Sequence, residues 1–199
     1  MSPTLRTFLT RTVITATLAL TSGISFADWQ LENTRSQVNF ISVKKSAVVE
    51  THRFKSVSGS IDRSGKAQID IDLSSVDTSI GIRDERLQKM LFETGLYPSA
   101  VLSAAIDSTL LDSLKTGESK SIDLSFELSL HGLTQSITTA VQVTALNEEQ
   151  VMVTTLQPIV IKAADFNLVE GINQLKKIAG LPSITTAVPV TAQLVFKKQ

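Results

Sequence analysis

The sequence contains no cysteine, only two histidines and few aromatic residues, which make up 5% of its 199 positions. Without cysteine the chain has no disulfide scaffold, no thiol nucleophile and no site for a cysteine-linked lipid anchor. The low aromatic content leaves few stacking surfaces for sugars or nucleotide bases. Basic and acidic residues number 19 each, so no net charge attracts nucleic acid. Stability must therefore come from apolar burial and hydrogen bonding.

The two histidines, His52 and His131, restrict the chemistry of the chain. They lie far apart and show no ligand-like spacing, so we expect no metal site. A serine nucleophile would need one of them as its base, and no triad pattern surrounds either, so we expect no catalytic residues and no enzyme. His131 follows a predicted strand at a turn, where it is expected to satisfy backbone groups. His52 has three interpretations: solvent exposure, the simplest one, a pair with Glu50, or contact with a polar head group.

The first 27 residues have the pattern of a cleaved signal peptide. Arg6 and Arg11 are the only charges before an apolar stretch over residues 12–20, and small side chains occupy the positions that a signal peptidase reads before Ala27. We therefore expect cleavage after Ala27 and export. A retained membrane anchor is the alternative, but polar residues interrupt the uncharged stretch and no stop-transfer pattern follows.

Removing 27 of the 199 residues leaves 172, enough for one domain over residues 28–199 and too few for two ordinary ones. The mature chain would carry 17 basic and 19 acidic residues, a net charge near −2. No repeat or linker divides it, so we expect a single domain.

Alternation of apolar and polar residues predicts an all-β, mostly antiparallel domain. Residues 121–131 alternate over their whole length, and residues 67–73 do so over a shorter one. Further strands are expected at residues 38–43, 48–61, 101–108, 136–146, 150–162 and 185–197. Polar turns at residues 62–65 and 147–149 predict hairpins, which favours a barrel or sandwich over βαβ units.

Two short helices are expected between the strands. Residues 82–93 carry apolar side chains at i, i+3 and i+4 among charged neighbours. Residues 170–179 end before Gly180 with two lysines in the last turn. Arg83 and Arg86 in the first helix have two interpretations. They bind a head group, or they form an ion-pair network or backbone clasp that fixes the helix to the barrel. The second interpretation is favoured because acidic residues separate the two arginines.

Several segments together resemble the YceI-like family of exported lipid-binding proteins. In order they are Trp29-Gln30-Leu31, Ser36-Gln37-Val38-Asn39-Phe40, Ser75-Val76-Asp77-Thr78, Arg83-Asp84-Glu85-Arg86-Leu87, Phe92, Tyr97-Pro98, Leu128-Ser129-Leu130-His131-Gly132-Leu133-Thr134 and Asp165-Phe166-Asn167. Each is weak alone, and their order and spacing make the match specific. The resemblance implies a lipocalin-like antiparallel β-barrel in the periplasm, whose lumen holds the chain of an isoprenoid-like or fatty amphiphile. It implies no required cofactor.

Two segments depart from the family pattern. Residues 44–54 replace its usual second-strand histidine region, and residues 168–184 form a longer connection than usual. Both are candidates for the surroundings of a ligand entrance. Residues 99–106 are rich in small side chains, which either leave room in the lumen or only permit close packing.

The resemblance and the strand alternation together nominate residues for a lipid site. The candidates for the lumen are Phe40, Phe54, Ile71, Leu87, Met90, Leu91, Phe92, Leu102, Phe126, Leu128 and Phe166. His52, Arg83 and Arg86 are candidates for head-group contacts. We expect a lipid-binding or carrier protein; the alternative is a barrel with a filled core that binds another envelope protein, and an envelope hydrolase ranks last. Homodimerisation stays open.

Overall fold

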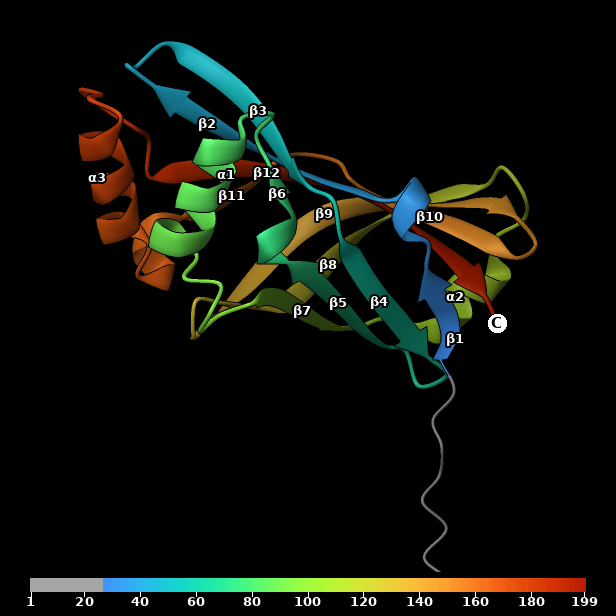
Figure 1. The fold of residues 1–199 in the computed structure, drawn as a ribbon. Coiled ribbons are helices and arrows are strands. Elements are labelled where there is room, and N and C mark those ends of the chain that lie inside the picture. Colours follow the sequence, from blue (N-terminus) through green and yellow to red (C-terminus); the bar gives the residue numbers. More distant parts are fainter. Residues whose placement is uncertain (1–26) are drawn as a thin grey trace, which may run out of the picture.

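The computed structural model describes residues 27–199, which form a closed antiparallel β-barrel capped by helices (Figure 1). Eight strands form the ring, in the order β1, β4, β5, β7, β8, β9, β10 and β12, and it closes because β12 also pairs with β1. Their bounds are β1 (Ala27–Leu31), β4 (Val57–Asp62), β5 (Lys66–Asp72), β7 (Ser99–Ala105), β8 (Ser119–Leu130), β9 (Leu133–Asn147), β10 (Gln150–Thr155) and β12 (Ala187–Lys198). The predicted barrel is confirmed.

Four further strands continue the wall toward one end. They are β2 (Gln37–Lys44), β3 (Val48–Phe54), β6 (Val76–Asp77) and β11 (Ile159–Lys162). The long strand β12 joins the two levels, since its first half pairs with β2 and β11 and its second half with β1 and β10. β3 pairs in turn with β2 and β6. Along β12 the barrel therefore has two successive levels of strands, one formed with β1 and β10 and the other with β2 and β11.

Two strands expected to be continuous are interrupted. The strand predicted over residues 48–61 breaks at residues 55–56, where the amide of Val57 donates to the side chain of Asn33 (2.8 Å) and that side chain donates to the carbonyl of Lys55 (3.1 Å). The strand predicted over residues 150–162 breaks before Pro158, which has no amide hydrogen for a strand ladder. Side-chain and proline chemistry at these points overrides the β propensity.

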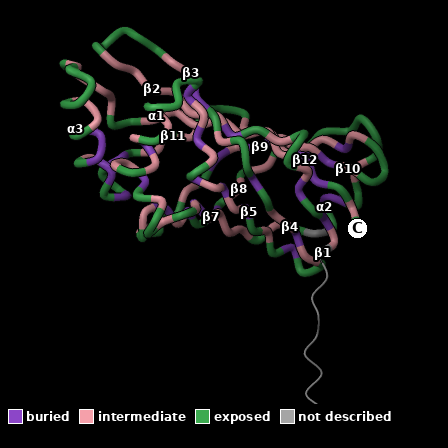
Figure 2. The backbone as a smooth tube through the Cα atoms, in the orientation of Figure 1, coloured by how far each residue is buried: buried purple, intermediate pink, exposed green. Residues whose placement is uncertain are grey.

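Alternation along β8 sets the inner and outer faces of the wall as predicted. Phe126, Leu128 and Leu130 are buried, whereas Glu127 between them is exposed. The twelve pairs with β9 run to a tight turn in which His131 and Gly132 both have positive φ, 51° and 77°. Buried residues accordingly alternate with half-buried or exposed ones along much of β8 and β9, and Figure 2 shows buried, half-buried and exposed segments following one another along the chain.

Helices cover both ends of the barrel. At one end lie α1 (Gly81–Arg86), the π-helical turn η3 (Leu87–Leu91) and α3 (Val169–Ile178), close to the two helices predicted. At the other end lies α2 (Ser108–Ser113), where the sequence had predicted a strand to residue 108. That strand ends earlier because the Asp107 carboxylate caps a helix, accepting from the amide of Thr109 at 3.0 Å.

Within residues 27–199, no helix has the length and apolar character needed to cross a membrane. The proposed leader and its cleavage site lie at the edge of the described residues or outside them.

Candidate functional site: an apolar lumen with a polar end

Two apolar cavities adjoin inside the barrel, and together we call them the lumen. One, of about 110 Å³, extends toward α2, and the other, of about 170 Å³, extends toward η3 and α3. Each has room for several water-sized groups. The residues shared by both walls are Ile69, Leu102, Phe126, Ile159, Ala192 and Leu194. The lumen therefore extends, as two adjoining cavities, from the end covered by α2 to the end covered by η3 and α3.

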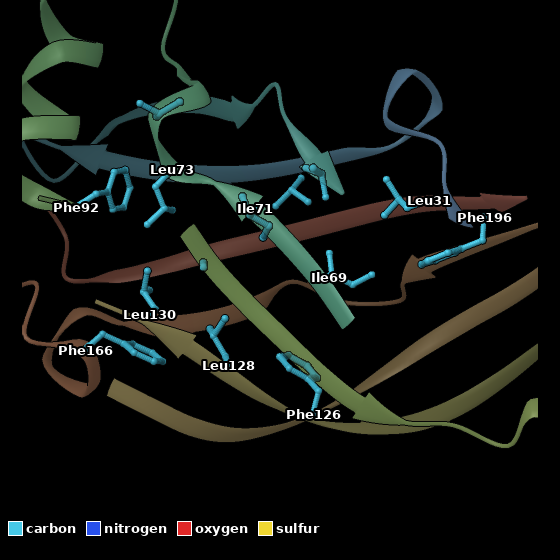
Figure 3. Packing of buried hydrophobic residues seen from close by; sticks show 14 of the residues in the cluster. Leu31, Ile69, Ile71, Leu73, Phe92, Phe126, Leu128, Leu130, Phe166 and Phe196 are labelled. Atoms are coloured by element: carbon cyan, nitrogen blue, oxygen red, sulfur yellow. The ribbon is translucent and has the colours of Figure 1, made fainter. Parts of the chain in front are cut away.

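The lumen wall is apolar almost throughout. Thr139 and Thr155 are the only polar residues among those that line it, and both border the cavity toward α2. Figure 3 shows side chains from opposite walls, among them Ile71, Leu128 and Phe126, pointing into the space between the strands. Such a space cannot satisfy the hydrogen bonds of a polar ligand, so it is suited to a hydrocarbon chain.

Eight of the eleven candidates for the lumen line it. They are Phe40, Phe54, Ile71, Leu91, Phe92, Leu102, Phe126 and Leu128. Three of the aromatic rings form a continuous row, with centroids 5.3 Å apart between Phe40 and Phe54 and 5.8 Å apart between Phe54 and Phe92. The row connects the β2–β3 ribbon to the end of η3.

The other three candidates do not line the lumen. Leu87 is buried at the start of η3, and Phe166 is buried in the short helix η4 (Ala163–Phe166) with 1% of its surface exposed. Met90 is half-buried, and its backbone lies close to α3. A β-carbon added to Gly171 of α3 would be only 2.6 Å from the Met90 carbonyl oxygen. Within η3 and the residue after it, only Leu91 and Phe92 line the lumen, so Leu87 and Met90 pack elsewhere in the cap.

The sequence interpretation missed the half of the lumen near α2. Val141, Val143 and Leu194 line it from strands predicted over residues 136–146 and 185–197, and their positions in those strands are the signal that could have identified them. Leu110 and Leu111 line it from α2, which lies just beyond the strand predicted over residues 101–108. Of the two interpretations of residues 99–106, room in the lumen is supported, since Ala100, Leu102 and Ala104 all line it.

A polar cluster adjoins the lumen on the β2–β3 ribbon. His52 is buried, with 5% of its surface exposed, so the expectation of a solvent-exposed side chain is wrong. Its ring lies 5.1 Å from the ring of Phe40, and its Nε2 is 3.0 Å from the hydroxyl of Ser42. Burial lowers the pKa of His52, and the positive charge of Arg83 lowers it further, so the ring is neutral at pH 7.

Glu50 links two cations beside His52. Its carboxylate lies 2.7 Å from the Lys44 ammonium and 2.9 Å from the Arg83 guanidinium. The hydrogen bond from Lys44 lowers the pKa of Glu50 most, partial burial opposes this effect, and the hydrogen bond from Arg83 lowers the pKa further. Glu50 therefore pairs with these cations and not with His52.

Arg83 and Asp84 clasp the start of α1 to the segment before it. The Arg83 guanidinium donates to the carbonyl of Thr78 at 2.7 Å, while the Asp84 carboxylate accepts from the amide of Thr78 at 2.9 Å and from its hydroxyl. The predicted ion-pair network and backbone clasp are confirmed for Arg83. Arg86 is half-buried and makes no ion pair or side-chain hydrogen bond with any of residues 27–199.

His131 has the structural role expected of it. Its Nδ1 donates to the carbonyl of Phe166 at 3.1 Å, its Nε2 lies 2.8 Å from the Glu93 carboxylate, and its ring packs against Tyr97. It therefore joins the β8–β9 turn to η4 and to the end of η3.

The pair of Ser42 and His52 resembles a nucleophile and its base, but the third member of a triad is absent from the described residues. His52 Nδ1 has no hydrogen-bond partner, and Glu50 is engaged by Lys44 and Arg83. No three histidine, aspartate or glutamate side chains gather into a candidate metal site within residues 27–199.

Comparison with known proteins places the barrel among related structures. The model of the YceI-like domain matches residues 29–196. A polyisoprenoid binding domain from Saccharophagus degradans, implicated in plant cell wall breakdown, is 40% identical, with a TM-score of 0.86 over 87% of this chain and 100% of that one.

Two more distant structures share the fold. Burkholderia cenocepacia BcnA is 20% identical, with a TM-score of 0.62 over 83% of this chain and 98% of its own. The YceI protein of Campylobacter jejuni is 18% identical, with a TM-score of 0.54 over 74% of this chain and 84% of its own. No curated protein matches the sequence significantly.

Proposed function

Because this chain belongs to the YceI-like family, and because its barrel encloses an apolar lumen, we propose that it binds an amphiphilic lipid by holding an isoprenoid-like or fatty chain in that lumen. The observation that carries the proposal is the apolar wall, which extends from η3 to α2 and leaves space unfilled. The relative from S. degradans, described as a polyisoprenoid binding domain, favours an isoprenoid chain.

Burial of the chain would supply most of the affinity. Each methylene transferred from water contributes about 0.8 kcal/mol, less the cost of immobilising a flexible chain. The half-buried lumen residues Phe40, Leu102 and Leu194 are partly exposed because they face this space, so a ligand would complete their packing. Affinity should therefore increase with chain length until the lumen is full.

We further propose that the protein is exported to the periplasm and carries its lipid there. The support is the leader-like pattern of residues 1–27, together with an enclosed lumen that would shield a lipid chain from water. N-terminal sequencing of the protein from the envelope fraction should find Asp28 first. Recovery of a chain that retains Met1 in a membrane pellet would contradict export and release.

Native mass spectrometry of protein purified from its own host tests lipid binding directly. We expect a co-purifying lipid, released on unfolding, and uptake of fluorescent lipids by protein stripped of it. If several preparations carry no lipid and take up none, the lumen does not bind lipid. The alternative of a filled barrel that serves only as a protein-interaction module is disfavoured by the unfilled lumen.

A further inference from the structure

Two unsatisfied buried atoms lie in the polar cluster beside the lumen. Within residues 27–199, four buried side-chain nitrogen or oxygen atoms lack a hydrogen-bond partner: His52 Nδ1, Arg83 Nε and the hydroxyls of Thr154 and Thr185. Buried polar atoms are seldom left without partners, because each costs free energy comparable to a lost hydrogen bond. The coincidence of two such atoms in one cluster points to a missing partner.

The cluster begins where the lumen wall ends. Along the inner face of the β2–β3 ribbon, the cross-strand pairs are Val38 with Phe54, then Phe40 with His52, then Ser42 with Glu50. Val38, Phe54 and Phe40 line the lumen, whereas His52, Ser42 and Glu50 do not. A chain lying against the Phe40 and Phe54 rings would therefore bring the group at its end toward His52.

The charges of the cluster cancel. Lys44 and Arg83 are positive, Glu50 and Asp84 are negative, and His52 is neutral at pH 7. Both cations already contact Glu50, so a phosphate or carboxylate would have to compete with it and to approach Asp84. A neutral oxygen needs no such exchange, since it can accept from Arg83 Nε–H while the neutral imidazole donates or accepts.

We propose that His52 and Arg83 form a head-group site for an uncharged, oxygen-bearing end of the lipid, a hydroxyl or a carbonyl. This inference rests on the proposed function, because the lipid chain must occupy the adjoining lumen. The two unsatisfied atoms bind the oxygen, and the Glu50 ion pairs hold Arg83 in position. Specificity for the head group then comes from one buried histidine and one buried guanidinium nitrogen.

Competition among three ligands with the same isoprenoid chain tests the proposal. Geranylgeraniol, geranylgeranyl monophosphate and the corresponding hydrocarbon are added together to lipid-free protein in detergent, and bound species are counted by native mass spectrometry. We expect the alcohol to bind about tenfold more tightly than the hydrocarbon, as two added hydrogen bonds would give, and more tightly than the phosphate.

Variants of the site separate the head group from the chain. His52→Phe keeps a ring against Phe40 but has no polar atom, so it removes one of the two hydrogen bonds, and the preference for the alcohol over the hydrocarbon should fall about threefold while hydrocarbon binding stays. Arg83→Lys keeps the charge for Glu50 but has no Nε–H, so it should also reduce the preference. Arg53→Gln is the matched control, because Arg53 lies on the outer face of β3 and pairs there with Asp77.

The outcomes distinguish this proposal from the proposed function. An unchanged preference in folded His52→Phe and Arg83→Lys, or a wild-type preference for the phosphate, would overturn the head-group site and leave lipid binding intact. Failure of all three ligands to bind wild-type protein would remove both proposals together.

Discussion

Phe126 and Glu127 are neighbours in β8, yet their side chains lie on opposite faces of the barrel wall. Phe126 is buried and borders both cavities, whereas Glu127 is exposed. We expect Phe126→Asn to lower the free energy of unfolding by about 3 kcal/mol or more, since it removes a buried ring and places an amide against an apolar wall. Glu127→Asn should change it by no more than about 0.5 kcal/mol. Urea unfolding measures both, and equal losses would show that the face assignment is wrong.

Glu50 is the carboxylate through which acid should act on the polar cluster. Its pKa in the folded protein is lowered from an ordinary value of 4.5, chiefly by the hydrogen bond from Lys44. A lowered carboxyl pKa contributes stability that is present above about pH 4.5 and is lost as the pH falls through the folded value.

The wild type should therefore lose more stability than Glu50→Gln between pH 5 and the acid limit of folding. Urea unfolding at a series of pH values measures the difference between the two curves. Glu127→Gln, an exposed substitution on the outer face of β8, is the control and should follow the wild type. Parallel curves for the wild type and Glu50→Gln would mean that the Lys44 and Arg83 contacts contribute nothing to stability.

Most elements of the fold were predictable, because β-strand alternation is a local property. The exceptions have local and non-local causes. Asp107 followed by Thr109 and two leucines is a helix-start pattern, so α2 could have been recognised from the sequence. The break at residues 55–56 could not, since it depends on Asn33, which is distant in the chain.

The packing of α3 against η3 depends on a glycine. A β-carbon at Gly171 would lie 2.6 Å from the Met90 carbonyl oxygen and 2.9 Å from the Leu91 α-carbon, so backbone would have to move. We expect Gly171→Ala to lower the free energy of unfolding by about 1–3 kcal/mol and to speed hydrogen exchange in α3. Gly95→Ala is the control, because a β-carbon there meets no atom within 4 Å. Equal stability of the two variants would contradict a close fit between the helices.

Leu91 tests whether η3 controls access to the lumen or only packs against it. Its side chain lines the lumen, whereas that of Leu87, in the same turn, is buried without lining it. We expect Leu91→Ala to raise the rate at which bound lipid leaves the folded protein. Leu87→Ala should lower the free energy of unfolding by about 2–5 kcal/mol, and with it the unfolding midpoint. It should leave the rate of lipid release unchanged. If Leu91→Ala shifts only the unfolding midpoint and leaves the release rate unchanged, η3 does not control access to the lumen.

At the scale of the whole molecule, the barrel brings together residues that the sequence separates widely. The candidates Phe40, Phe92 and Leu128 meet around one lumen because β12 closes the ring and η3 folds over its end. Alternation predicted which side chains face inward, but it held no information on how much space they leave. The position of Arg83 beside His52 likewise depends on how α1 docks against the β2–β3 ribbon, and local sequence patterns do not specify that docking.

Occupation of the lumen should stabilise the molecule as a whole. A lipid that binds only the folded chain adds about 2.7 kcal/mol at a free concentration of one hundred times its Kd. For a domain of this size each kcal/mol raises the melting temperature by roughly 2–4 °C, so loading should raise it by roughly 5–10 °C. Ala192→Phe provides the test of location, because Ala192 lines both cavities and a larger side chain there fills the space where they meet. This variant should melt cooperatively without lipid, and its melting temperature should rise much less on lipid loading than that of the wild type. An equal gain would place the lipid outside the lumen, since a blocked barrel would then bind it as well as an open one.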